Sequence, residues 1–107
     1  MSCQVIQVGT TAAAKSDLEK IADELVQRRL AACVQIGGPM TSRYWWQGKV
    51  ETAEEWWCVI KTTRDKYDRV EETIRRLHPY DVPDILATPV ESGNPDYLKW
   101  VADEAAG

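Results

Sequence analysis

Two tryptophan doublets, Trp45-Trp46 and Trp56-Trp57, flank the turn-forming pair Gln47-Gly48. The residues around them are rich in β-branched and aromatic side chains, which predicts the two arms of a β-hairpin. Because neighbouring side chains on a strand point to opposite faces, each doublet places one indole on each face of the sheet. A small domain covers one face with its own helices, so large indoles on the other face predict a surface that a partner covers.

Length and composition limit the class of protein. The chain has 107 residues, which suits a single domain spanning residues 1–107. Its hydrophobic fraction of 44% and charged fraction of 28% are those of an ordinary globular protein. The net charge of −4 argues against a nucleic-acid partner, which would require a basic surface. No stretch is apolar enough to span a membrane and no secretory leader is recognised, so neither a membrane partner nor export is expected.

The cysteines indicate a reducing compartment. Cys3, Cys33 and Cys58 are an odd number without CxxC spacing, which is typical of reduced thiols rather than of a disulfide framework. The expected location is therefore the cytoplasm. Cys58 shares a strand face with Trp56 and Ile60, which favours a position in the core.

Hydrophobic periodicity predicts a βαββαβ order followed by a further helix. The strands are expected at residues 3–8, at 32–36 continuing through 41–46, at 50–63 and at 83–90, the last as an edge strand bounded by prolines. The first helix is expected from the capping-box pair Ser16 and Glu19, or from one turn earlier at Thr11. The second ends before His78-Pro79, and the third starts at Asn94-Pro95. This order defines an α+β, ferredoxin-like fold.

The predicted hairpin is long for the domain that carries it. As an uninterrupted strand, residues 33–46 would extend roughly 46 Å, whereas a globule of this size is only about 34 Å across. The hairpin tip is therefore expected to overhang the domain even if the bend at Gly37-Gly38-Pro39 shortens it. With a tight turn after the first doublet, that doublet lies opposite residues 50–52 and the second lies opposite residues 38–41, so the doublets do not face each other. An overhanging two-stranded ribbon is not stable alone in water, which predicts that it docks on another subunit.

Five short blocks occur in order along the chain: Leu30-Ala31-Ala32-Cys33, Tyr44-x-Trp46-x-Gly48-Lys49, Lys61-Thr62, His78-Pro79-Tyr80-x-x-Pro83 and Tyr97-x-x-Trp100. Together they resemble the CutA divalent-cation-tolerance family. The resemblance implies a homotrimer of PII-like architecture, in which long hairpins extend sheets between subunits. It also implies a non-enzymatic role in tolerance of copper and other divalent metals, with no required cofactor and with other copies of the chain as partners. The aromatic residues expected at the trimer interface are Tyr44, Trp45, Trp46, Trp57 and Trp100.

Two residues are candidate metal ligands. Cys33 matches the family cysteine and offers a soft ligand for copper, although a small buried hydrophobe is the alternative. His78 supplies the only imidazole of the chain, a ligand for Cu(II) or Zn(II). Its alternative role is to bind the last carbonyls of its helix or to order the turn that follows. Thr10 and Leu77 stand where some relatives carry further ligands, so a closed ligand set is not expected.

A small-molecule cleft is the alternative to a metal site. By analogy with the PII-type arrangement, Lys61, Glu55 and Tyr80 could hold an anionic small molecule between subunits, or Lys61 is a buried lysine satisfied by Glu55. Residues 9–14 contain neither the anion-binding arginine of an acylphosphatase nor the CxxC of a heavy-metal chaperone, and the third strand is acidic where an RNA-recognition module is basic. The sequence therefore favours a trimeric protein of divalent-metal (copper) tolerance over a trimeric sensor of an anionic small molecule.

Overall fold

The computed structural model describes residues 4–106, which form a four-stranded sheet and three α-helices. Along the chain the elements are β1 (Val5–Ala12), α1 (Lys15–Gln27), β2 (Cys33–Trp46), β3 (Lys49–Thr63), a 3₁₀ helix (Arg64–Lys66), α2 (Tyr67–Leu77), β4 (Leu86–Pro89) and α3 (Pro95–Glu104). The strand order is β2-β3-β1-β4, and every neighbouring pair is antiparallel. The expected α+β, ferredoxin-like order, with the PII-like arrangement of a single chain, is confirmed.

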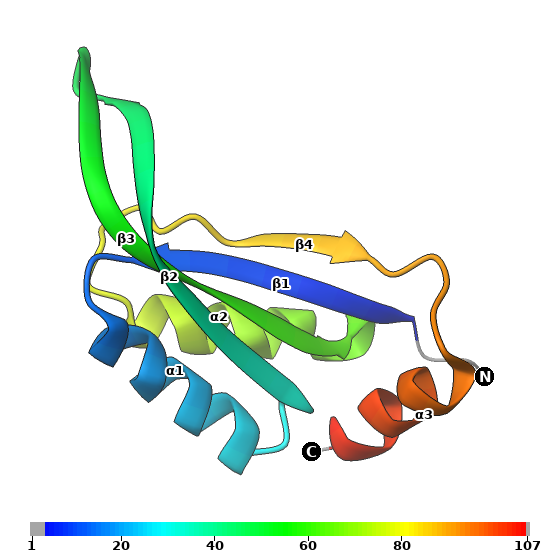
Figure 1. The fold of residues 1–107 in the computed structure, drawn as a ribbon. Helices are drawn as coiled ribbons and strands as arrows, with labels where there is room; N and C mark the ends of the chain where they lie inside the picture. Colours follow the sequence, from blue (N-terminus) through cyan, green and yellow to red (C-terminus); the bar gives the residue numbers. More distant parts are fainter. Residues whose placement is uncertain (1–3, 107) are drawn as a thin grey trace.

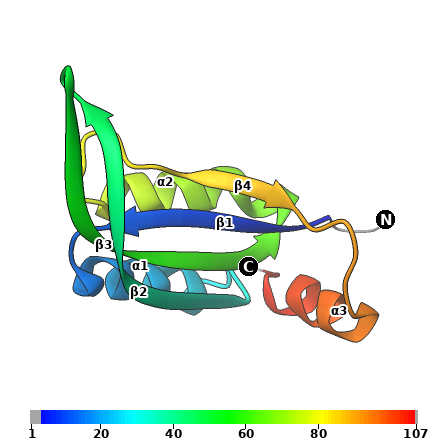
Figure 2. The same cartoon turned by 45° about the horizontal axis from the view of Figure 1, so that its top comes forward.

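Two helices cover one face of the sheet. Figure 1 shows α1 and α2 side by side on that face, with α3 at the end of the sheet away from the hairpin tip, and Figure 2 shows the same arrangement from a second direction. Along β3, Cys58 and Ile60 are fully buried, whereas the alternate residues Trp57 and Val59 are not. The core position expected for Cys58 is therefore confirmed. The core consists of Ile6, Val8, Ala12, Leu18, Ile21, Leu25, Leu30, Ala31, Cys58, Ile60, Val70 and Ile74.

The first and last strands along the chain differ in length from the prediction. β1 runs on through Gly9 to Ala12, beyond the end expected at residue 8. Gly9 keeps both backbone hydrogen-bonding groups and lies opposite Val59, so it does not interrupt the ladder. Cys3, the first residue of the expected strand, lies outside the described residues. β4 forms an edge strand as expected, but it pairs only with the segment of β1 from Ile6 to Gly9 and is shorter than residues 83–90.

The expected capping box of α1 is wrong. The helix begins at Lys15 after an extended Ala14, and no side chain caps it. β1 carries the chain as far as Ala12, so a start at Thr11 is also excluded, and Ser16 already lies within the first helical turn. The S-x-x-E spacing therefore falls inside the helix rather than at its boundary.

The ends of α2 and α3 follow their sequence signals. α2 ends at Leu77, and His78 before the proline is extended, as expected for a residue that precedes proline. At the start of α3 the side-chain oxygen of Asn94 accepts a hydrogen bond from the Asp96 N–H at 2.9 Å. The predicted cap of the last helix is therefore confirmed.

β2 and β3 form the long hairpin that the tryptophans predicted. The turn residues Gln47-Gly48 have φ angles of 50° and 79°, the left-handed pair that suits a two-residue hairpin turn. Trp45 lies opposite Val50, while Trp57 lies opposite Gly37, one position below the predicted range 38–41. The doublets therefore occupy different heights of the ribbon, as expected.

A bulge bends the hairpin away from the sheet. The register of β2 against β3 shifts between Gly37 and Met40, where the sequence predicted an interruption. Figure 1 shows the upper part of the β2–β3 hairpin turning out of the sheet and rising away from the layer of α1 and α2. The molecule measures 47 × 26 × 21 Å, and the long dimension matches the overhang that strand length predicted.

We expect Gly38→Ala to lower the free energy of unfolding by about 1–3 kcal/mol. Gly38 has φ +138°, and a Cβ added there would lie 3.2 Å from the Cα of Trp56 and 3.3 Å from the Glu55 carbonyl oxygen. Urea denaturation measures the change. Gly9→Ala is the matched control, because its Cβ would meet only the Cys58 carbonyl oxygen at 3.8 Å. Equal losses in the two variants would contradict this account of the bulge.

Candidate functional site

A groove of about 660 Å³ lies between the lower hairpin and the loop that follows α2. β2, β3 and the end of β1 supply one part of its lining, and the loop between α2 and β4 supplies the rest. The lining residues are Thr11, Met40, Ser42, Arg43, Tyr44, Trp46, Glu55, Tyr80, Asp81, Val82 and Asp84. Charged, hydroxyl and aromatic groups from four separate segments therefore meet in one concave site.

Glu55 and Tyr80 are joined at this groove. Glu55 is only 6% exposed, and the Tyr80 hydroxyl donates a hydrogen bond to its Oε2 at 2.7 Å. Burial and then the neighbouring Glu55 carboxylate raise the pKa of the Tyr80 hydroxyl above its ordinary value. Tyr80 is thus a fixed hydrogen-bond donor to the buried acid. The fold therefore brings together Glu55 and Tyr80, two residues of the predicted small-molecule cleft.

Thr11 connects the end of β1 to the loop. Its N–H and its hydroxyl donate to Oδ1 of Asp84 at 3.1 and 2.7 Å. The Thr11 hydroxyl has one hydrogen, so its 3.5 Å approach to Oε2 of Glu55 is the weaker contact. No local motif identifies Thr11 or Asp84, since both belong to the groove only because β1 runs to Ala12 beside β3.

His78 orders the loop rather than offering a free imidazole. It is buried, its Nε2–H donates to the Thr11 carbonyl oxygen at 2.6 Å, and its Nδ1 accepts from the Tyr80 N–H at 3.1 Å. The tautomer follows from this network, because the Tyr80 amide can only donate. Both ring nitrogens are therefore engaged, and the turn-ordering alternative is the arrangement that the structure contains.

The structure separates the two predicted metal ligands. Cys33 is half-buried and lies opposite Lys61, whereas His78 binds Thr11, which lies opposite Trp57. Lys61 and Trp57 are about 13 Å apart along β3 at the usual strand rise. Residues 4–106 contain no group of three or more histidine, cysteine and acidic side chains placed to hold a metal ion. The described residues of one chain therefore do not fit a dedicated metal centre.

Lys61 is also remote from the predicted cleft. Its ammonium donates to the Tyr97 hydroxyl at 3.2 Å and lies 5.2 Å from the centre of that ring. Lys61 and Glu55 sit on the same strand about 20 Å apart, so Glu55 does not satisfy this lysine. The expected pairing of Lys61 with Glu55 is wrong, because the extended strand holds the two side chains too far apart to touch.

The aromatic residues expected at an interface remain accessible in the single chain. Tyr44, Trp45, Trp46, Trp57 and Trp100 are all among the exposed large hydrophobic residues, with Trp45 at 75%. The Trp57 indole lies across Gly37, where a Cβ would approach its Nε1 to 3.2 Å. Trp100 stacks on Tyr97 with ring centres 5.6 Å apart. Trp56, on the opposite strand face, packs against the core, so the second doublet does place one indole on each face.

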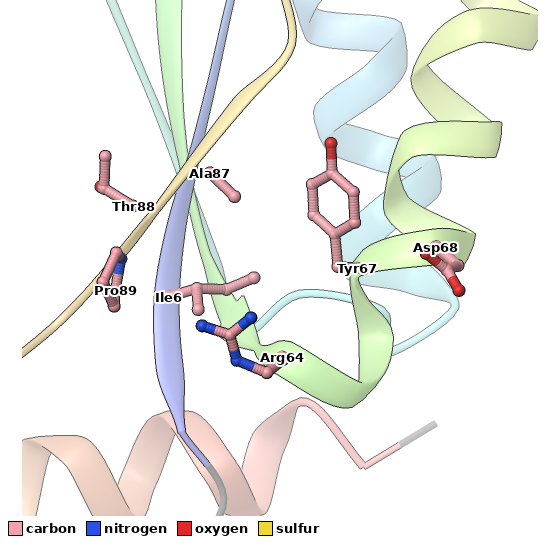
Figure 3. Close-up of a pocket in the computed structure, with 7 residues that line it drawn as sticks. All are labelled: Ile6, Arg64, Tyr67, Asp68, Ala87, Thr88 and Pro89. Carbon is pink, nitrogen blue, oxygen red and sulfur yellow. The ribbon is translucent and has the colours of Figure 1, made fainter.

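A smaller cavity of about 400 Å³ lies where β1 and β4 meet the start of α2. Figure 3 shows the Arg64 guanidinium next to Ile6, while the Asp68 carboxylate lies on the other side of Tyr67. The polar groups of this cavity do not converge on a common point. The groove beside the hairpin is therefore the better candidate site.

Comparison with known proteins defines the class. A family model described as the CutA1 divalent ion tolerance protein matches residues 6–104. The divalent-cation tolerance protein CutA of Pyrococcus horikoshii is 39% identical over 100 residues, which cover 94% of this chain and 97% of that protein. A solved structure from Thermus thermophilus, named divalent cation tolerance protein (Cut A1), has a TM-score of 0.91 at 39% identity, covering 94% of this chain and 97% of that one.

These matches, with the ferredoxin-like sheet and its long hairpin, define a class of proteins named for tolerance of divalent cations. The family is not known as a family of enzymes, in agreement with the non-enzymatic role expected from the sequence. This chain belongs to the CutA1 divalent ion tolerance protein family. It spans 55% of the length of one relative, the CutA homolog of Xenopus laevis, with 47% identity over 83 residues.

Relatives are assigned to different compartments by name. The structure from Archaeoglobus fulgidus is named periplasmic, and the CutA 1 protein of Oryza sativa is named chloroplastic. Within residues 4–106, none of the helices has the length and apolar character needed to cross a membrane.

We expect Cys33 to be alkylated by iodoacetamide at pH 8 on the order of a hundredfold faster than Cys58. Burial raises the pKa of the Cys58 thiol to about 11, so this thiol stays protonated and unreactive at that pH. Peptide mass spectrometry of a Cys3→Ser variant measures the two sites. The same protein in guanidinium chloride is the control, in which both thiols react. Equal rates in the folded protein would contradict the burial of Cys58.

Proposed function

We propose that this chain acts in the cytoplasm as a non-enzymatic homotrimer in divalent-cation tolerance, with copper among the metals concerned. The observation that carries the tolerance role is the family match over residues 6–104. Free Cys33 and Cys58, neither in a disulfide, agree with a reducing compartment.

The exposed hairpin supports assembly. Its aromatic residues Tyr44, Trp45 and Trp46 are exposed together near the tip of a ribbon that projects beyond the domain. β4 is an exposed edge strand that carries Leu86 on its surface. An open edge and an overhanging aromatic ribbon on the same chain suit contacts between copies, since each removes an apolar or unpaired surface from water.

Copper contact, under this proposal, is weak and involves Cys33. The half-buried thiol of Cys33 is a soft ligand, which binds copper more strongly than it binds the hard divalent cations. His78 is already committed to Thr11 and Tyr80. Tolerance would then depend on the assembled protein rather than on a closed metal centre within one chain.

The alternative is a PII-like trimeric sensor of an anionic small molecule. Lys61 is the cation on which that alternative depends, and it lies with Tyr97 rather than with Glu55 and Tyr80. The carboxylates of the groove repel an anion, so the structure favours the tolerance role.

We expect Trp46→Ala or Trp57→Ala to weaken the oligomer by at least about 2 kcal/mol per interface, because buried tryptophans dominate protein interfaces. Light scattering over a concentration series should show a trimer mass for the wild type and dissociation of the variants at low concentration. Val26→Ala, an exposed apolar position on α1, is the matched control. A variant mass that stays unchanged on dilution, or loss of the monomer fold by circular dichroism, would contradict the assignment.

We expect titration with Cu(II) and Zn(II) to show weak copper binding that Cys33→Ala removes and that His78→Ala leaves in place. Both nitrogens of His78 are hydrogen-bonded, so its removal should destabilise the fold by about 1–3 kcal/mol without deleting a ligand. Isothermal calorimetry measures binding and thermal melting measures stability. Identical copper binding by the wild type and by the Cys33→Ala/His78→Ala double variant would exclude both residues as ligands.

A further inference from the structure

The groove beside the hairpin contains a buried negative charge that no cation of the described chain balances. Glu55 is 6% exposed, yet none of the ion pairs within residues 4–106 includes it. Its Oε2 accepts a hydrogen bond from the Tyr80 hydroxyl at 2.7 Å and lies 3.5 Å from the Thr11 hydroxyl, whose hydrogen is donated to Asp84. Its Oε1 receives no hydrogen bond from the described residues. Oε1 is not among the buried side-chain atoms that lack a partner, so this oxygen is open to the groove and free to accept a hydrogen bond from a ligand there.

The charges around Glu55 strengthen the demand for a cation. Asp81 and Asp84 also line the groove, and neither takes part in an ion pair within the described part of the chain. Asp84 uses Oδ1 for both of its bonds to Thr11, which leaves Oδ2 without a donor among residues 4–106. Arg43 is the single basic residue of the lining, and its guanidinium donates to Thr52 on the hairpin. The groove is therefore acidic.

The remaining lining residues indicate that the ligand has an organic part beside its charged group. Tyr44, Trp46 and Tyr80 contribute aromatic surface, and Met40 and Val82 contribute apolar surface. Aromatic faces attract a cation placed over them, and they also pack against the apolar part of a small molecule. A volume of about 660 Å³ is in the range of sites for small organic ligands. A bare metal ion would use the carboxylates but not these aromatic surfaces.

We propose that this groove binds a small organic cation, an ammonium group carried on an aromatic or aliphatic body. The ammonium donates to Glu55 Oε1 and to the Asp84 carboxylate, and the body packs between Tyr44, Trp46 and Tyr80. The site is distinct from Cys33 and does not depend on metal binding. It shares Tyr44 and Trp46 with the hairpin surface expected at subunit contacts. The opposite charge of the ligand separates it from the anionic molecule expected by analogy with PII-type proteins.

A charge series of nearly isosteric ligands tests this assignment. Isothermal calorimetry on the full chain in its native oligomeric state compares 2-phenylethylammonium with neutral 2-phenylethanol and anionic phenylacetate. We expect the ammonium to bind with a Kd in the millimolar range or tighter, which a ligand of this size can reach, and the other two to bind at least about tenfold more weakly. Equal binding of the three compounds, binding of phenylacetate alone, or no binding of the ammonium would overturn the proposal.

A matched pair of variants locates the site. Glu55→Gln keeps an acceptor for the Tyr80 hydroxyl but removes the charge, and it should weaken ammonium binding by about tenfold or more. Glu54→Gln makes the same change of net charge at the exposed neighbouring residue on the other strand face, and should change the affinity less than about twofold. Equal effects of the two substitutions would place the ligand elsewhere. The ligand series on the wild type decides the outcome if Glu55→Gln proves unstable. This ligand series measures ammonium binding alone. A negative result would therefore contradict the ammonium site without contradicting the tolerance or assembly proposals.

Discussion

The antiparallel pairing of β1 with β3 is the constraint on which the rest of this structure depends. It keeps Thr10 to Ala12 in extended conformation opposite the segment from Trp56 to Cys58, at the level where the hairpin bends away. Thr11 is then held at the edge of the core with its carbonyl, amide and hydroxyl available. His78 binds the carbonyl and Asp84 binds the other two groups. One register thus positions the loop after α2 and forms the wall of the groove.

Two side chains that could ligate a metal, Cys58 and His78, serve packing and turn geometry instead. Cys58 is a core side chain whose thiol is kept neutral by burial. The imidazole of His78 bridges two backbone groups and presents Tyr80 to Glu55. Membership of a metal-tolerance family is therefore compatible with a chain in which the strongest potential ligand is already a structural bridge. What remains unusual chemically is a buried carboxylate without a counter-charge.

The hairpin and the groove share residues, which links recognition to assembly. Tyr44 and Trp46 are exposed aromatic residues expected at subunit contacts, and they also line the groove. Strand alternation places Tyr44 and Trp46 on the same side of the ribbon and Trp45 on the other side. Ordering of the hairpin by a neighbouring copy would therefore reposition one wall of the proposed ammonium site.

Local sequence signals predict the order of elements, the hairpin with its bulge, the separation of the tryptophan doublets, the end of α2 and the cap of α3. These features depend on local periodicity, on proline and glycine geometry and on strand length, all of which can be counted along the chain. The predicted strand length also implies that Lys61 and Glu55, on the same strand, lie too far apart to pair. Thr11 and Asp84 join Glu55 and Tyr80 in one site only through the tertiary fold, because their meeting depends on long-range strand register and on where a loop crosses the sheet. Periodicity assigns a residue to a face, but it does not assign the neighbour that meets it there.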